Sequence, residues 1–178
     1  MKLRFLSSNR HKISEVSKIL GAIDVSVVPV GQKIEEIQTE DVEAIVRDKT
    51  IKAFHKLGCP LFVEHTSLHL AALNGLPAGL TQVFWDRLGA DRVSALFVAK
   101  TRIGYCDGKK IHQFEGEVAG KITPKPEGNR DFQWDCVFIP NGEKRTFAEM
   151  GDDKNAISMR KHALDSFAEF LKRNIHAG

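Results

Sequence analysis

Hydrophobic side chains recur along this chain with two periods. Short apolar or alternating runs, typical of strands, span residues 2–6, 24–30, 61–64 and 134–139. Apolar residues at helical spacing span residues 11–20, 40–57 and 153–173. Strand-like and helix-like segments therefore alternate, which predicts an α/β fold with a mixed central sheet flanked by helices.

Two segments in the middle of the chain have weaker patterns. Residues 80–99 are expected to form two short helices with a break near Gly89. Residues 101–123 predict a β-hairpin or meander, with turns at Asp107 and Gly108 and near Gly116. No repeat, linker or low-complexity tract interrupts the pattern, so residues 1–178 are expected to form a single domain.

Composition narrows the class of protein. Hydrophobic residues make up 42% and charged residues 28% of the chain, as in a soluble globular domain. The net charge of +3 permits an anionic ligand but does not by itself indicate a nucleic-acid surface. Three widely spaced cysteines argue against disulfides and zinc, and they favour a cytoplasmic location. Neither a signal peptide nor a membrane span is expected.

Three polar residues, Ser8, Asn9 and Lys12, lie between the first predicted strand and the first predicted helix. A strand–loop–helix junction directs backbone N–H groups and the positive end of the helix dipole to one point, which suits an anion. Lys12 adds a mobile positive charge to that point. The alternative interpretation is a capped helix start with a solvated lysine.

A second group of candidates lies near the C-terminus. Phe132 and Trp134 flank one residue, so in a strand both rings would face the same way. Such a pair could hold a purine, or it could pack in the core like most aromatics at strand spacing. Lys154 and Ser158 follow, one helical turn apart, with Arg160 just beyond them. Here the alternative is a solvated helix start.

His65 and His69 have the i, i+4 spacing that chelates zinc on a helix. In this chain the pair follows a predicted strand and leads into an extended segment. Four residues of strand span about 13 Å, which is too far for two ligands of one ion. Zinc is therefore not expected.

Short motifs occur in collinear order over most of the chain. They are Ser7-Ser8-Asn9-Arg10-His11-Lys12, Glu36-Ile37-Gln38, Val63-Glu64-His65-Thr66, Leu73-Asn74-Gly75-Leu76-Pro77 and the block from Phe132 to Arg160. Together they resemble the inosine triphosphate pyrophosphatase family, whose members hydrolyse deaminated purine triphosphates. Two positions depart from the family pattern, because His65 stands where the family has Asp and Met159 stands where it has His.

The resemblance implies roles for individual residues. Glu43 and Glu64 would hold Mg²⁺, and Glu64 with His65 would occupy the place where the attacking water is polarised. Imidazole is a poor ligand for Mg²⁺, so His65 predicts weakened hydrolysis. The residues that would contact the nucleotide are Ser8, Asn9, Lys12, Phe132, Trp134, Asp135, Lys154, Ser158 and Arg160.

Two main functional hypotheses follow. In the first, a cytoplasmic homodimer binds dITP, ITP or XTP with little or no hydrolysis, as a sensor or regulatory subunit for an effector protein partner. The resemblance suggests bacterial antiphage defence as one setting for such a protein. In the second, the protein is an active Mg²⁺-dependent pyrophosphatase that releases a nucleoside monophosphate and pyrophosphate. A third hypothesis, nucleic-acid binding, rests only on mild basicity and ranks last.

Overall fold

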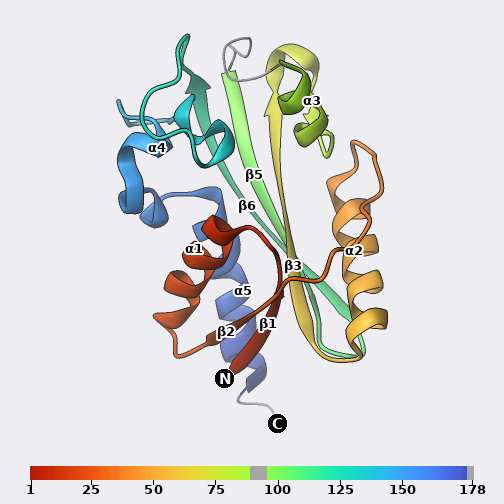
Figure 1. Cartoon of the computed structure of the whole chain (residues 1–178). Coiled ribbons are helices and arrows are strands. Elements are labelled where there is room, and N and C mark those ends of the chain that lie inside the picture. Colours follow the sequence, from red (N-terminus) through yellow and green to blue (C-terminus); the bar gives the residue numbers. More distant parts are fainter. Residues whose placement is uncertain (89–95, 176–178) are drawn as a thin grey trace.

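The computed structural model describes residues 1–88 and 96–175 (Figure 1). The strands are β1 (Lys2–Leu6), β2 (Ser26–Val30), β3 (Leu61–Leu70), β4 (Pro77–Ala78), β5 (Leu96–Cys106), β6 (Ile111–Ile122) and β7 (Phe138–Pro140). The α-helices are α1 (Arg10–Gly21), α2 (Val42–Leu57), α3 (Thr81–Leu88), α4 (Phe147–Met150) and α5 (Met159–Ile175). Short 3₁₀ helices are η1 (Ala71–Leu73), η3 (Gln133–Cys136) and η4 (Gly151–Ala156).

The strands within these ranges form one mixed sheet. Its order is β2-β1-β3-β5-β6-β7, and β4 pairs with β3. The strands β2, β1 and β3 run parallel, whereas β3, β5, β6 and β7 are successively antiparallel. The α/β fold with a mixed sheet, predicted from the alternating periods, is confirmed.

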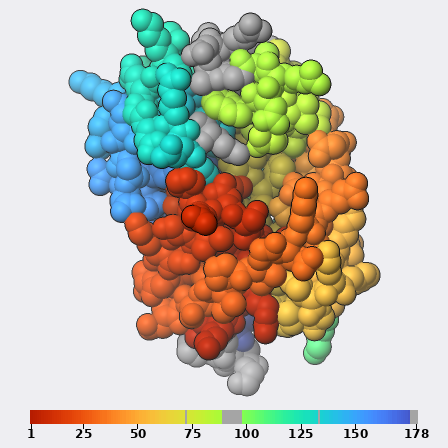
Figure 2. All heavy atoms as spheres, in the orientation of Figure 1, coloured from red at the N-terminus to blue at the C-terminus, as the bar shows by residue number. Residues whose placement is uncertain are grey.

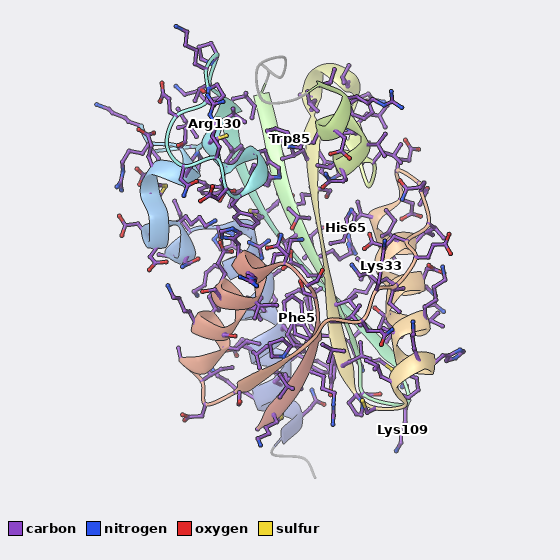
Figure 3. The ribbon with its side chains drawn as sticks, in the orientation of Figure 1. Phe5, Lys33, His65, Trp85, Lys109 and Arg130 are labelled. Atoms are coloured by element: carbon purple, nitrogen blue, oxygen red, sulfur yellow. The ribbon has the colours of Figure 1, made fainter. Side chains whose placement is uncertain are left out.

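Helices cover the two faces of the sheet separately. α1 and α5 pack on one face, and α2 packs on the other (Figure 1). A Cβ added to Gly116 would overlap the backbone of α5, whereas one added to Gly104 would overlap side chains of α2. Phe5 lies in the layer with α1 and α5, and His65 lies across β3 toward α2 (Figure 3). Within the described ranges, no helix has the length and apolar character needed to cross a membrane.

Polar residues fix where the helices near the sheet begin. Asn9 caps α1, because its side-chain oxygen accepts hydrogen bonds from the amides of His11 at 3.0 Å and Lys12 at 3.2 Å. Asp41 caps α2 by accepting a hydrogen bond from the amide of Ala44 at 3.0 Å. The first turn of α1 therefore starts at a fixed point just after β1 ends.

The expected turn near Gly116 is wrong. Gly116 lies inside β6, opposite Thr101 of β5, and the turn at Asp107 and Gly108 alone joins the two strands. Gly116 is needed because α5 packs against it, not because the chain reverses there. The first helix expected within residues 80–99 is α3, but residues 96–99 belong to β5, and residues 89–95 lie outside the described residues.

Two expectations near the C-terminus also need correction. The predicted strand over 134–139 is a 3₁₀ helix followed by the short strand β7. Its amides bond three residues back, from Asp135 to Phe132 at 3.2 Å and from Val137 to Trp134 at 3.0 Å. The predicted last helix likewise starts as η4, and α5 begins only at Met159.

β3 is much longer than its parallel neighbour. β1 pairs with it only as far as Phe62, and β4 pairs with it only from Leu68 onward. Between these two residues, the same edge of β3 has no strand partner in the part of the chain that the structure describes. Lys12 of α1 reaches this edge at Thr66, so the open edge of β3 lies beside the start of α1. On the surface, red N-terminal atoms meet blue-green atoms of the segment near residue 130 (Figure 2).

Candidate functional site

A cavity of about 290 Å³ lies where β1 ends and α1 begins. The polar residues around it include Ser7, Ser8, Asn9, Lys12, Lys33, Glu36, Lys49 and Glu64. Three lysines and the first amides of α1 therefore surround one small volume. Such an arrangement suits an anion, because the helix dipole and the lysine charges both favour negative charge there. We call this the first cavity.

Lys12 points from α1 toward the open edge of β3. Its Nζ lies 3.1 Å from Glu64 Oε1 and donates a hydrogen bond to Thr66 Oγ1 at 3.4 Å. Burial lowers the pKa of Lys12, and the neighbouring Glu64 carboxylate offsets only part of that effect. An anion in the first cavity would supply further counter-charge and would favour the protonated lysine.

Arg160 of α5 holds two carboxylates beneath the site. Its side chain is buried, with the residue only 1% exposed. Its Nε and Nη2 donate to the two oxygens of Glu64 at 2.7 and 2.9 Å, and its Nη1 contacts Glu15. Burial disfavours the charged form of Glu64, but Arg160 and Lys12 outweigh it and hold the pKa of Glu64 well below its usual range. Glu64 therefore stays ionised at neutral pH.

A second cavity, of about 360 Å³, lies on the other side of the first turn of α1. The adjacent residues His11 and Lys12 line different cavities, so this turn separates them. Residues around the second cavity include His11, Glu15, Lys18, Asp131, Phe132, Asp135, Asp152 and Lys154. Acidic side chains outnumber lysines here, in contrast to the first cavity.

A donor and two acceptors lie beside an aromatic ring in the second cavity. Lys154 Nζ lies 2.5 Å from Glu15 Oε1, contacts Asp135, and lies 4.3 Å from the centre of the Phe132 ring. Burial raises the pKa of Asp135, and the Lys154 charge offsets part of that rise. Together these groups could bind the polar edge of a flat heterocycle and stack on its face.

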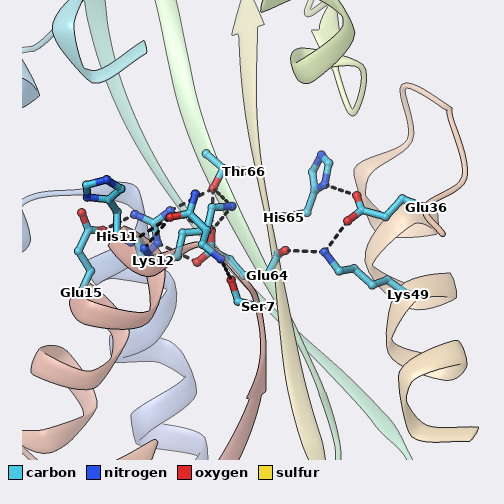
Figure 4. Close-up of polar contacts among 11 residues, drawn as sticks. Ser7, His11, Lys12, Glu15, Glu36, Lys49, Glu64, His65 and Thr66 are labelled. Atoms are coloured by element: carbon cyan, nitrogen blue, oxygen red, sulfur yellow. Dashed lines mark hydrogen bonds and ion pairs between the residues drawn. The ribbon is translucent and has the colours of Figure 1, made fainter. Parts of the chain in front are cut away.

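The opposite face of β3 carries a separate polar cluster (Figure 4). Glu36 accepts a hydrogen bond from Lys49 at 2.6 Å, and its other oxygen lies 3.5 Å from His65 Nδ1. The contact with His65 and the charge of Lys49 outweigh burial and lower the pKa of Glu36 to about 2. Lys49 also donates to the backbone oxygen of Glu64 at 3.4 Å, so this cluster reaches the open edge of β3. Among the described residues, His65 Nε2 is buried without a hydrogen-bond partner.

One carboxylate of the first cavity, Glu36, is placed to contact a magnesium ion. Glu36 is ionised and its side chain is 33% exposed, whereas both oxygens of Glu64 already contact Arg160. In proteins, Mg²⁺ is often held by one or two carboxylates together with phosphate oxygens. No group of three or more His, Cys, Asp or Glu within the described ranges could hold a metal ion. A bound anion would therefore have to complete the coordination.

The chain is similar to known proteins over almost its whole length. A family model described as the Ham1 family matches residues 3–170. The chain belongs to the Ham1 family. Similar proteins include a dITP/XTP pyrophosphatase of Methanopyrus kandleri, 34% identical over 98% of both chains. An inosine triphosphate pyrophosphatase of Kluyveromyces lactis is 35% identical over 94% of both chains.

Solved structures agree with the fold. A HAM1 protein from Coxiella burnetii is similar over 97% of this chain and 99% of its own, with a TM-score of 0.78 and 24% sequence identity. The Staphylococcus aureus Ham1 protein is similar over 98% of this chain and all of its own, with a TM-score of 0.76 and 20% identity. At this level of identity the likeness concerns the fold.

In this Ham1-family chain, most of the predicted site residues lie together around the start of α1. Ser8, Asn9, Lys12 and Glu64 line the first cavity, and Phe132, Asp135 and Lys154 line the second. Arg160 lies between them through its contacts with Glu64 and Glu15. Residues separated by up to 145 positions in sequence thus meet at one place.

Two of the predicted nucleotide contacts, Trp134 and Ser158, lie in the protein interior. Trp134 is 3% exposed and packs edge-on against Phe138, with 5.4 Å between ring centres. Ser158 is 1% exposed, and its hydroxyl accepts a hydrogen bond from the amide of Lys161 at 3.2 Å. Phe132 is only partly buried and faces the second cavity. η3 replaces the expected strand, yet Phe132 and Trp134 both line a small pocket together with Asp135 and Arg160.

Glu43 lies apart from both cavities. Its side chain is 68% exposed, and its ion-pair partner is Arg102 at 3.9 Å. Glu36, and not Glu43, lies with Glu64 at the first cavity. The sequence contained a signal for it, because Glu36 begins one of the family motifs. Glu15 and Lys49 also reach the site, but both lie outside the motifs, so no comparable signal existed.

The two histidines of β3 have different partners. β3 extends to Leu70, so both lie on a strand, as the sequence predicted. His65 contacts Glu36, whereas His69 Nε2 lies 3.0 Å from Ser67 Oγ. This strand geometry agrees with the expectation that the pair does not chelate zinc.

Proposed function

We propose that this chain is a Mg²⁺-dependent pyrophosphatase of deaminated purine nucleoside triphosphates such as dITP, ITP and XTP. The observation that carries the proposal is the pair of cavities on either side of the first turn of α1. One is lined by lysines and helix amides, and the other by an aromatic ring and buried acids. A nucleoside triphosphate has two matching parts, an anionic triphosphate and a flat aromatic base. The names of relatives such as the Methanopyrus kandleri dITP/XTP pyrophosphatase support this assignment.

The second cavity would hold the base. A 6-oxopurine presents a ring N1–H and a carbonyl oxygen next to each other, whereas adenine presents an unprotonated N1 and an amino group. Asp135 can accept from N1–H, and Lys154 can donate to the oxygen. Phe132 would stack on the ring. Arg160 was expected to donate to the base, but it binds Glu15 and Glu64 instead, so Lys154 is the better-placed donor.

The first cavity would hold the triphosphate. Ser8 and Asn9 would place the triphosphate at the positive end of the α1 dipole, and Lys12 and Lys49 would neutralise its charge. Glu36 would hold Mg²⁺ together with phosphate oxygens, because both oxygens of Glu64 are bonded to Arg160, and the ion would supply Lewis-acid activation of the phosphate. A water oxygen attacks the α-phosphorus and the bond from this phosphorus to the α–β bridging oxygen breaks. Pyrophosphate leaves with that oxygen, and the water proton passes to solvent.

Binding without turnover is the second candidate. Its supporting observation is His65, which provides an imidazole where the family motif has a carboxylate. A sensor would then need an effector protein partner, and a homodimer would be one possible assembly. The names of the relatives favour hydrolysis instead, and they give no support to an antiphage role. Measurement of turnover therefore separates the two candidates.

The test is pyrophosphate release from dITP, ITP and ATP with Mg²⁺, for wild type and two matched variants. We expect dITP and ITP to be preferred over ATP. Glu36→Gln should lower kcat/KM by about 100-fold or more, because it removes an ionised metal ligand. Glu43→Gln removes the same charge from an exposed side chain outside both cavities and should have little effect.

Two outcomes would contradict this assignment. Wild type that binds ITP without releasing pyrophosphate would favour the sensor. An equal loss of kcat/KM in both variants would place the metal elsewhere.

A further inference from the structure

His11 and Phe132 form an aromatic pair at the second cavity that no motif predicted. Their ring centres lie 5.0 Å apart and their planes differ by 20°, which is a near-parallel offset stack. Both residues line the second cavity. Phe132 is partly buried, whereas His11 is exposed. The stack therefore joins a ring fixed in the loop before η3 to a ring at the surface of α1.

The backbone of His11 is fixed while its side chain is free to turn. Its amide donates to the Asn9 side chain at 3.0 Å, which holds the first turn of α1 in place. The His11 side chain is at the solvent side of the cavity, and its stacking partner in this structure is Phe132. Rotation about the side-chain bonds would uncover the Phe132 face without moving the helix.

We propose that His11 clamps the nucleobase against Phe132. The 5.0 Å stack leaves no room for a third ring between the two side chains, so a purine must displace the imidazole to reach Phe132. The His11 ring then stacks on the outer face of the purine, which solvent would otherwise contact. The single stack of His11 on Phe132 in the free protein is thus replaced by two stacks in the complex, one on each face of the purine. This inference rests on the proposed function and adds a second base-binding surface to it.

The clamp is tested with two ligands that are not nucleoside triphosphates, so the proposed reaction does not consume them during the measurement. IMP carries the base and one phosphate, whereas inorganic tripolyphosphate carries no base. Calorimetry should show that His11→Ala weakens IMP binding by roughly 5- to 100-fold, the range for loss of one base-stacking ring. Tripolyphosphate affinity should be unchanged. His11→Phe should restore IMP binding, because it keeps an aromatic face.

His112→Ala is the matched control. Its imidazole also packs on an aromatic ring, that of Phe170 at 4.5 Å, but it lines neither cavity. With ITP as substrate, His11→Ala should raise KM more than it lowers kcat. IMP affinity that is unchanged or tighter in His11→Ala, or not restored by phenylalanine, would overturn the clamp while leaving the pyrophosphatase assignment intact. Wild type that binds no IMP and releases no pyrophosphate from ITP would overturn both.

Discussion

At the scale of single residues, Glu36 owes its charge state to two neighbours on different elements. His65 comes from β3 and Lys49 from α2, and both contact its carboxylate. The separations of His65 and Lys49 from Glu36 in the sequence do not indicate that the three side chains are in contact. The residue was visible as part of a motif, but its surroundings depend on how the segment between β2 and α2 lies against the sheet.

The low pKa of Glu36 predicts a pH-dependent contribution to stability. In the folded protein it is about 2, against an ordinary value of 4.5. The ionised carboxylate therefore stabilises the fold above about pH 4.5, and this contribution is lost as the pH falls toward 2. Urea unfolding over this range should show that Glu36→Gln is less stable than wild type at neutral pH and approaches it in acid. Glu35→Gln, at an exposed neighbour, controls for the loss of one charge; a Glu36→Gln deficit that is independent of pH would contradict the prediction.

Residues of the site differ in how far sequence alone could find them. Asn9 and Lys12 were predictable, because a strand followed at once by a helix defines an anion-binding junction locally. Glu15 was not, since its role comes from contacts with Lys154 and Arg160 on distant segments. Buried charges of this kind require the whole fold.

At the scale of elements, η3 decides which aromatic ring can meet a ligand. Alternation of Phe132 and Trp134 is compatible with a strand, but the amide bonds to the third residue back turn one ring inward. The local sequence pattern could not distinguish a strand from a 3₁₀ helix here, because the three residues 132–134 fit either geometry. The hydrophobic surroundings of Trp134 settle the outcome.

The two rings should therefore respond differently to truncation. Trp134→Ala should lower the free energy of unfolding by about 3–5 kcal/mol, because it leaves a cavity in the core. Phe132→Ala should cost less stability but weaken IMP binding by roughly 5- to 100-fold. Urea unfolding and calorimetry on the same preparations measure both effects. A stable Trp134→Ala protein with selectively weakened IMP binding would restore Trp134 as the base platform.

Gly116 is a second residue whose role was wrongly predicted from the local pattern. It looked like a turn, but it is the point where β6 and α5 approach most closely, at the backbone of Met159 and Ala163. Only the packed structure shows which of the two uses of glycine applies.

We expect Gly116→Ala to lower the free energy of unfolding by about 1–3 kcal/mol, because the added methyl group must push α5 from the sheet. Urea unfolding monitored by circular dichroism measures this effect. Gly31→Ala is the control, since a Cβ there meets nothing within 4 Å. Equal stability of the two variants would mean that α5 can shift without loss of packing.

At the scale of the whole molecule, the fold brings two cavities of different charge to the same helix turn. α1 contributes His11 to one and Lys12 to the other. The fold class was predictable from alternating periods, but this division was not. It depends on the loop before η3 and the segment before α2 closing on α1 from opposite sides.

That division predicts different salt dependence for the two halves of the ligand. Lys12→Ala should weaken binding of inorganic tripolyphosphate by about 10-fold at low salt, and the difference from wild type should shrink as salt screens the charge. IMP binding should depend less on salt. Titration calorimetry at several salt concentrations measures both. Lys109→Ala, at an exposed lysine that lines neither cavity, controls for general loss of positive charge. Equal salt slopes for wild type and Lys12→Ala would contradict this role.

The unpaired edge of β3 has a consequence for solubility as well as for binding. An exposed strand edge can pair with a strand of another molecule, and natural proteins often guard such edges with lysine. Here Lys12 contacts the side chains at this edge and Lys49 donates to its Glu64 carbonyl. The two lysines that we assign to phosphate would then also keep the edge from recruiting other chains. Replacing both would remove the side chains that stand at this edge, so the same side chains that admit a substrate would also oppose pairing with a strand of another molecule.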